Sequence, residues 1–236
     1  MERFPAGPLS VDLSNWRGAP RPERAVLEGR YARLEPLDPE RHGEGLLASA
    51  LQPGAEDRFR YLFEEPPADA TSLSPWLARA SASDDPLFFA VIDRATGQVE
   101  GRQALMRIDT AHGVIEIGSI LWGPAIARTR IATEAFYLFA SYAFDTLGYR
   151  RFEWKCNDLN EPSKRAALRF GFTFEGVFRQ HMVVKGANRN TAWFSILDSE
   201  WPRLADAYRV WLAPENFDSE GRQKRKLGDC RPSRQS

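Results

Sequence analysis

The spacing of apolar residues along the first half of the chain predicts helices followed by an antiparallel sheet. Residues 31–37 alternate apolar and polar positions, which is typical of a strand with one buried face. Three helical patterns follow, separated by proline-containing loops, at residues 39–51, 56–63 and 72–83. Three strand-like runs joined by short turns come next, at residues 87–93, 101–108 and 114–122. We therefore expect an antiparallel meander in this half.

The second half of the chain changes to an alternation of strands and helices. Residues 131–147 carry apolar side chains at helical spacing, and Gly148 stands where a helix C-cap is expected. A shorter helix is expected at residues 162–170, closed by Gly171. Strands are expected at residues 151–156, 172–184 and 191–197, and a last helix at 202–212. A meander passing into this alternation predicts an α+β fold, with a mixed, mostly antiparallel sheet and helices on both faces.

The chain is expected to form one domain with two flanking segments. Residues 1–30 are rich in Pro, Gly and Arg, with Trp16 as an isolated apolar anchor, and predict an arm packed on the domain. Residues 31–212 hold all the regular elements and predict a single domain. Residues 213–236 are rich in Arg and Lys, and we expect a flexible, solvated basic tail.

Composition narrows the class of protein. Of the 236 residues, 43% are hydrophobic, which is ample for a packed core. Lys and Arg number 32, as do Asp and Glu, so no overall field favours nucleic acid or an anionic membrane. Two cysteines, Cys156 and Cys230, and three scattered histidines predict neither a disulfide framework nor a metal site. Lacking a signal-peptide pattern and a run of about 20 apolar residues, the chain is expected to be cytoplasmic.

The most informative stretch is residues 114–144, where a strand leads through a loop into a long helix. The strand ends at Trp122, a Gly-Pro turn follows, and the loop enters the helix directly. The N-terminus of a helix offers free backbone N–H groups and a positive dipole end, which together favour a phosphate. Arg128 and Arg130 in this loop would add positive charge, although they could also be ordinary solvated residues.

Within this stretch lies the segment WGPAIARTRIATEA. Together with the order of helices and strands, this segment resembles the acetyl-CoA-binding core of the GNAT superfamily, and in particular its RimJ/RimL-like amine acetyltransferases. In that family the loop has the pattern Gln/Arg-x-x-Gly-x-Gly/Ala, and its amides hold the CoA pyrophosphate. This chain matches at Ala132 but has Ala127, Arg128 and Arg130 where Gln/Arg and Gly are usual, and a non-Gly residue destabilises a positive φ. The cofactor contacts that the resemblance implies here are Ile120, Trp122, Arg128, Thr129, Arg130, Ile131, Ala132 and Thr133.

A second stretch, residues 150–179, resembles the family's strand, Asn-x-x-Ser helix and Gly-Phe segment. The resemblance implies that Asn160 contacts the pantetheine arm and that Ser163 lies beside the thioester sulfur as a general acid. Each has a simpler reading, because Asn160 would suit a helix N-cap and Ser163 a first-turn hydroxyl bonded to the backbone. Cys156 is either a competing proton donor or a small core residue.

Acetyl transfer to an amine also needs a base and donors for an oxyanion. Glu116 stands between Ile115 and Ile117 in a strand, so its side chain points to the opposite face from theirs. It would be a general base if that face lines a cleft, and otherwise a charge on a solvated face. Backbone N–H groups between Ile120 and Trp122 are the expected oxyanion donors.

The resemblance therefore implies an N-acetyltransferase that uses acetyl-CoA as acyl donor and no metal. A primary amine, either a protein N-terminus or a small molecule, would attack directly in a ternary complex. Related enzymes are often dimers, so the resemblance allows a homodimer, with no membrane and no specific nucleic acid as a partner. Three alternatives remain open: a non-catalytic acyl-CoA-binding protein, a transferase using another donor such as succinyl-CoA, and a nucleic-acid-associated protein using the basic tail.

Overall fold

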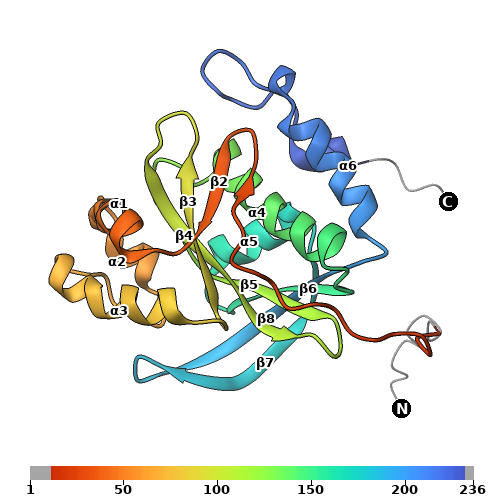
Figure 1. The fold of residues 1–236 in the computed structure, drawn as a ribbon, viewed down its shortest axis with the longest axis horizontal. Helices are drawn as coiled ribbons and strands as arrows, with labels where there is room; N and C mark the ends of the chain where they lie inside the picture. The colour runs from red at the N-terminus through yellow and green to blue at the C-terminus, as the bar shows by residue number, and fades with distance from the viewer. Residues whose placement is uncertain (1–11, 232–236) are drawn as a thin grey trace.

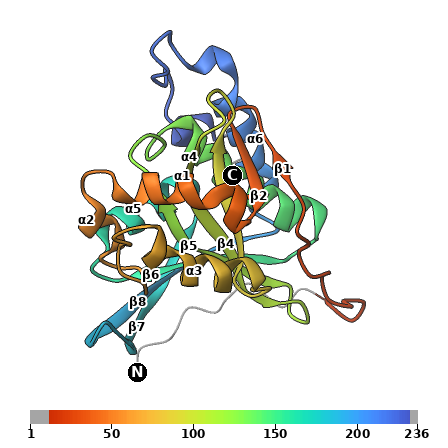
Figure 2. The same ribbon diagram turned by 60° about the vertical axis from the view of Figure 1, so that its left-hand side comes forward.

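An eight-stranded sheet forms the centre of the structure, a computed structural model that describes residues 12–231 (Figure 1). The strand order is β1-β2-β3-β4-β5-β6-β8-β7, and only the β5–β6 pair is parallel. The strands are β1 (Leu27–Glu28), β2 (Ala32–Pro36), β3 (Leu87–Asp93), β4 (Val99–Asp109), β5 (Val114–Trp122), β6 (Arg151–Asn157), β7 (Thr173–Val184) and β8 (Ala187–Leu197). The predicted mixed, mostly antiparallel sheet is confirmed, and the β7–β8 hairpin projects beyond the rest of it (Figure 2).

Helices cover both faces of this sheet (Figure 1). They are α1 (Pro39–Leu51), α2 (Ala55–Phe59), α3 (Ala70–Ala82), α4 (Arg130–Ser141), α5 (Glu161–Phe170) and α6 (Trp201–Leu212). The alternation along β3 explains the two layers, because successive side chains of a strand point to opposite faces. Phe89 and Val91 pack in the core under α4, α5 and α6, whereas Phe88 and Ala90 pack against α1 and α3.

The long helix of the second half ends earlier than the sequence predicts. Instead of continuing to Leu147, α4 ends at Ser141 and a π-helical turn (Tyr142–Thr146) follows. In this turn the amide of Leu147 donates to the carbonyl of Tyr142, five residues back. The wider turn allows Tyr142 and Phe144 both to be buried in the core.

The basic segment after residue 213 differs from the flexible, solvated tail that the sequence predicts. Residues 213–231 fold back on α6 through two short 3-10 turns, η2 (Pro214–Asn216) and η3 (Leu227–Cys230). Phe217, Leu227 and Cys230 are buried in the main core, so three apolar side chains anchor this charged segment. Residues 232–236 lie outside the described part of the chain.

The arm that precedes the domain also lies against it where the structure describes it. Residues 1–11 are outside the described range, but Trp16 is half-buried, and its indole N–H donates to the carbonyl of Ala111 at 2.7 Å. Further along, the Glu134 carboxylate accepts hydrogen bonds from the amides of Arg30, Tyr31 and Ala32. These bonds fix the start of β2 to α4. No helix between residues 12 and 231 is long and apolar enough to cross a membrane.

Candidate active site

A cleft opens where β5 and β6 separate. The two strands pair only from Val114 to Ile117 and from Arg151 to Trp154, although both continue beyond these pairs. Ser119 adopts a φ of +48°, an uncommon conformation for a residue with a side chain, directly after the last pair. The buried guanidinium of Arg102 donates to the Ser119 carbonyl at 2.7 Å and holds this kink. From here β5 follows β4, while β6 follows β8.

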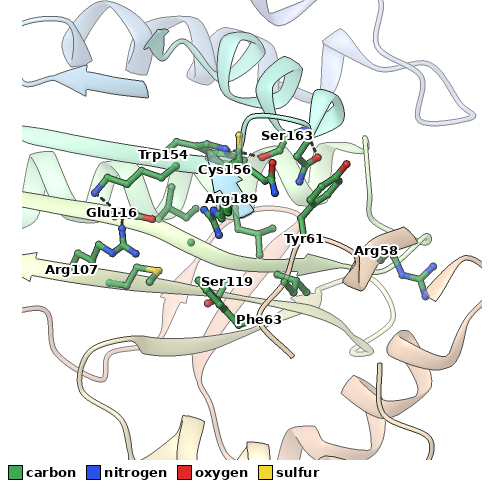
Figure 3. A pocket seen from close by; sticks show the side chains of 18 residues that line it. Arg58, Tyr61, Phe63, Arg107, Glu116, Ser119, Trp154, Cys156, Ser163 and Arg189 are labelled. Atoms are coloured by element: carbon green, nitrogen blue, oxygen red, sulfur yellow. Dashed lines mark hydrogen bonds and ion pairs between the residues drawn. The ribbon is translucent and has the colours of Figure 1, made fainter. Parts of the chain in front are cut away.

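The opening connects the two faces of the sheet. Ile117 and Trp154 are paired and point to the face covered by α5, which we call the α5 face. Glu116 and Lys155 point to the opposite face, which α1 and α3 cover farther along the sheet, and which we call the Glu116 face. The pocket at the opening is lined from both faces, and also by residues between 58 and 63, at and after the end of α2 (Figure 3).

On the α5 face, the sequence-predicted Asn160 and Ser163 lie beside Trp154 and Cys156. The Asn160 side-chain oxygen accepts from the Ser163 amide at 3.2 Å, so Asn160 is the N-cap of α5. The Trp154 indole donates to the Ser163 hydroxyl at 3.0 Å, which leaves the hydroxyl hydrogen free to be donated in turn. Burial raises the pKa of the Cys156 thiol, and the neighbouring Ser163 opposes that shift. Both residues line the pocket, and no charged side chain takes part in these contacts.

On the Glu116 face, charged side chains replace these neutral contacts. Glu116 is 3% exposed, lines the pocket, and pairs with Lys155 at 2.9 Å and with Arg107 at 3.3 Å. Lys155 also pairs with Glu153 at 2.5 Å, and its ammonium lies 3.9 Å from the centre of the Trp193 ring. Burial raises the pKa of Glu116, whereas Lys155 and Arg107 act to lower it. Glu116 therefore faces a cleft and is not a charge on a solvated surface.

The predicted phosphate loop lies outside this pocket, at the N-terminus of α4. Arg128 is exposed and has a φ of +66°, so a non-Gly residue does occupy the strained position expected from the sequence. Thr129 is the N-cap of α4, and its hydroxyl accepts from the Ile131 amide at 3.1 Å. That amide is consequently occupied within the loop. The Arg130 guanidinium lies over the ring of Tyr31 at 4.3 Å, so it points toward the start of β2 rather than into solvent.

The remaining predicted contacts divide between pocket and core. Ile120 lines the pocket, but the Trp122 indole donates to the Gln103 side chain at 3.1 Å and packs against the core. Ala132 is buried in the first turn of α4. The Thr133 hydroxyl in the same turn accepts from Arg169 at 3.1 Å. Trp122 and Ala132 can thus offer only their main chains to a ligand.

Several residues of the site are absent from the sequence prediction. Trp154 and Lys155 line the pocket and lie in the predicted strand 151–156. The sequence pattern there indicates only which face of the strand each occupies, and gives no sign of a role in the site. Arg169 is partly buried against the first turn of α4, where burial lowers its pKa. Arg189 is buried in the pocket, and the sequence prediction started its strand two residues later. Within residues 12–231, no group of three or more His, Cys, Asp or Glu side chains could hold a metal ion.

Comparison with known proteins agrees with this architecture. The family profile described as the acetyltransferase (GNAT) domain matches residues 33–173. The solved structure of a GCN5-related N-acetyltransferase from Brucella melitensis is 64% identical, with a TM-score of 0.91, covering 92% of this chain and 99% of that one. A probable acetyltransferase of the GNAT family from Chromobacterium violaceum is 40% identical, with a TM-score of 0.77, covering 85% of this chain and 100% of that one.

A curated relative that is named as an N-acetyltransferase matches over a shorter stretch. The uncharacterized N-acetyltransferase p20 of Bacillus licheniformis is 31% identical over 117 residues, which are 48% of this chain and 63% of that protein. The profile match spans the splayed strands, the Glu116 face and the α5 helix described above. The resemblance identified in the sequence is thus confirmed, and the chain belongs to the GNAT acetyltransferase family.

Proposed function

We propose that this protein is an N-acetyltransferase that moves the acetyl group of acetyl-CoA to a primary amine by direct attack in a ternary complex. The observation that carries the proposal is the opening between β5 and β6. It joins a face that holds a neutral proton donor, Ser163, to a face that holds a buried carboxylate, Glu116. Acetyl transfer to an amine needs one group of each kind, on opposite sides of the thioester.

Acetyl-CoA fits the α5 face. Its pantetheine arm would lie beside Asn160, and its sulfur would lie near the Ser163 hydroxyl. The pyrophosphate would meet the N-terminus of α4, beside Arg128. Arg169 supports this placement, because it contacts the first turn of α4 and pairs with no carboxylate of the described residues. A cation at the positive end of a helix dipole is unfavourable unless an anion lies between them.

The reaction then needs two proton transfers and no covalent enzyme intermediate. Glu116, directly or through a water molecule, takes a proton from the amine, whose nitrogen attacks the thioester carbonyl carbon. Backbone N–H groups of β5 beyond the kink at Ser119 stabilise the oxyanion. When the C–S bond breaks, Ser163 donates its proton to the thiolate and regains one, through water, from the nitrogen that becomes the amide; a thiol pKa of about 8.5 makes a hydroxyl a sufficient donor.

Two of the alternatives are less well supported by the contacts of the described residues. A protein that only binds acyl-CoA has no need of a carboxylate that is 3% exposed and held by two cations, which is costly to bury. Nucleic-acid binding through the basic tail requires free charge, but Arg222 pairs with Asp218 and Glu220, and the segment packs on α6.

The experiment is a measurement of CoA release. Purified protein is mixed with acetyl-CoA and a panel of amines that includes amino acids, small amines and peptides with free N-termini. We expect release that depends on the amine, with an acetylated amine identified by mass spectrometry, and its loss in the Glu116→Gln Ser163→Ala double variant. Binding of acetyl-CoA by calorimetry with no release for any amine would contradict the proposal and favour a binding protein.

A further inference from the structure

One buried cation of the pocket, Arg189, has no charged partner among residues 12–231. Arg189 lies in β8 on the Glu116 face, because its alternation with Thr191 and Trp193 places these side chains beside Asn157 and Lys155 of β6. It is 8% exposed and lines the pocket near its middle (Figure 3). Its Nε donates to the Thr191 hydroxyl at 3.2 Å, and its guanidinium carbon lies 5.5 Å from the centre of the Phe63 ring. Among residues 12–231 no carboxylate forms an ion pair with it.

The other cations that line the pocket are all satisfied by the protein itself. Lys155 and Arg107 both pair with Glu116. Arg58 points away from the pocket centre (Figure 3) and donates to carbonyls at and after the end of α1, including those of Ala50 and Gln52. Arg189 is therefore the one lining guanidinium in the described chain whose only hydrogen-bond partner is a neutral side chain. Buried charges are normally paired, so this arginine lacks an anion.

The charge balance of the Glu116 face points in the same direction. Four cations, Arg107, Arg151, Lys155 and Arg189, face three carboxylates, Glu116, Glu153 and Glu175. A primary amine in water is mostly protonated and would be repelled by this surplus. An amine that also carries a carboxylate would be attracted, because its anion cancels the surplus and its nitrogen still reaches Glu116. Arginine suits this task because its planar fork can bind both oxygens of a carboxylate.

We infer that Arg189 binds the carboxylate of the acceptor, and that the acceptor is a small amine carrying a carboxylate, of which a free amino acid is the simplest. This inference rests on the proposed function, since it names the class of amine that enters beside Glu116. A peptide N-terminus lacks the carboxylate that Arg189 would bind, because the α-carboxylate of its first residue has become a neutral amide. The carboxylate belongs to the acceptor rather than to the acyl donor because Arg189 lies on the Glu116 face, opposite Ser163 and Asn160.

The test compares amino acids with matched amides that lack only the carboxylate. The common L-amino acids and their amino acid amides are assayed with saturating acetyl-CoA, and kcat/KM is measured for wild type, Arg189→Gln, Arg189→Lys and Arg179→Gln. Arg179 is the matched control, since it is an exposed arginine of the same hairpin outside this pocket. For the preferred amino acid we expect wild type to favour the acid over its amide on the order of 10²-fold, as for other buried charge pairs.

The variants should change this preference in a graded way. In Arg189→Gln the preference should fall to a few-fold or less, because kcat/KM falls far more for the acids than for the amides. Arg189→Lys should retain part of the preference, and Arg179→Gln all of it. Calorimetry with the CoA-saturated protein measures binding of the same pairs without turnover. If the amino acid binds more tightly than its amide and Arg189→Gln abolishes the difference, the inference stands even if no CoA is released, and only the proposed function fails.

Three results would overturn the inference while leaving acetyl transfer intact. The first is equal kcat/KM for amino acids and their amides in wild type, a comparison that does not depend on any variant folding. The second is a preference for peptides with free N-termini over amino acids. The third is an Arg189→Gln variant that changes only the ratio of activity with succinyl-CoA to activity with acetyl-CoA, because the carboxylate would then come from the donor.

Discussion

The two faces of the sheet at the β5–β6 opening hold their polar groups in opposite ways. On the α5 face the contacts are between neutral groups, with Trp154 donating to Ser163 and Asn160 capping the helix. On the Glu116 face they are between charges, with Lys155 bridging Glu116 and Glu153 at 2.9 and 2.5 Å. In the proposed function, this difference reflects what each face binds.

The chemistry of acetyl transfer accounts for this difference. A departing thiolate is a modest base, so a hydroxyl held by an indole is an adequate donor on the α5 face. An amine must lose a proton near neutral pH, with a pKa of about 7.7–8.0 for an α-amino group and about 10.4 for lysine. In the proposed mechanism the base is Glu116, a carboxylate whose pKa is raised by burial, and the surrounding cations stabilise its buried charge.

The largest effect is expected on the Glu116 face. Replacing Glu116 with Gln should lower kcat/KM on the order of 10²- to 10⁴-fold, since it removes the base but keeps the shape. Burial raises the pKa of Glu116, and a base acts only when deprotonated, so wild-type activity should fall as the pH drops through that raised pKa. The acidic limb of the pH–rate profile should disappear in the variant. Wild-type rates with an unchanged limb would assign Glu116 a purely structural role.

A smaller effect is expected on the α5 face. Replacing Ser163 with Ala should lower kcat on the order of 10²-fold, as for other removed transition-state donors, while the affinity for acetyl-CoA holds. The variant should still fold, but with a free energy of unfolding lower by about 1–3 kcal/mol, because the buried indole of Trp154 loses its acceptor. Cys156→Ala serves as the parallel variant. An active Ser163→Ala enzyme beside an inactive Cys156→Ala enzyme would transfer the donor role to the thiol.

The smallest effect is expected at the phosphate loop, which lies outside both faces of the opening. Replacing Arg128 and Arg130 together with Ala should raise the KM for acetyl-CoA about 10-fold, the size of one or two exposed charge-assisted bonds, and leave the acceptor KM nearly unchanged. Arg128→Ala alone should account for most of this, because the Arg130 guanidinium already stacks on Tyr31. An unaltered KM for acetyl-CoA in the double variant would show that CoA does not bind at this loop.

Periodicity predicts the framework of this fold well. The strand alternation at β3 and the helical spacing of α4 are local signals. β3 occurs where it was expected, and α4 begins within one residue of its predicted start, although it ends earlier, at Ser141. The segment after residue 213 was predicted to be a flexible, solvated tail because its composition is charged. Its position instead depends on three apolar residues that are buried in the core of the domain. Burial of this kind depends on tertiary contacts, which the amino-acid composition of a segment does not predict.

The residues of the candidate site also divide into some that the sequence predicted and some that it did not. Glu116, Asn160 and Ser163 follow from alternation and from the family's spacing, and all three line one pocket. Lys155 and Arg189 do not follow, because they are brought together by the pairing of β6 with β8, whose paired residues lie more than thirty positions apart in the chain. Residue spacing also could not predict that Thr129 caps α4, since a Thr at this position could equally have contacted a ligand.

The central claim is that one opening brings a donor on the α5 face and a base on the Glu116 face to the same thioester. A crystal structure of the protein with bound acetyl-CoA tests this directly. The account predicts the thioester sulfur within about 3.5 Å of the Ser163 hydroxyl, near hydrogen-bonding range, with the acetyl carbonyl in the opening and facing the Glu116 side. Acetyl-CoA bound with its thioester outside the β5–β6 opening, or entering from the Glu116 face, would contradict it.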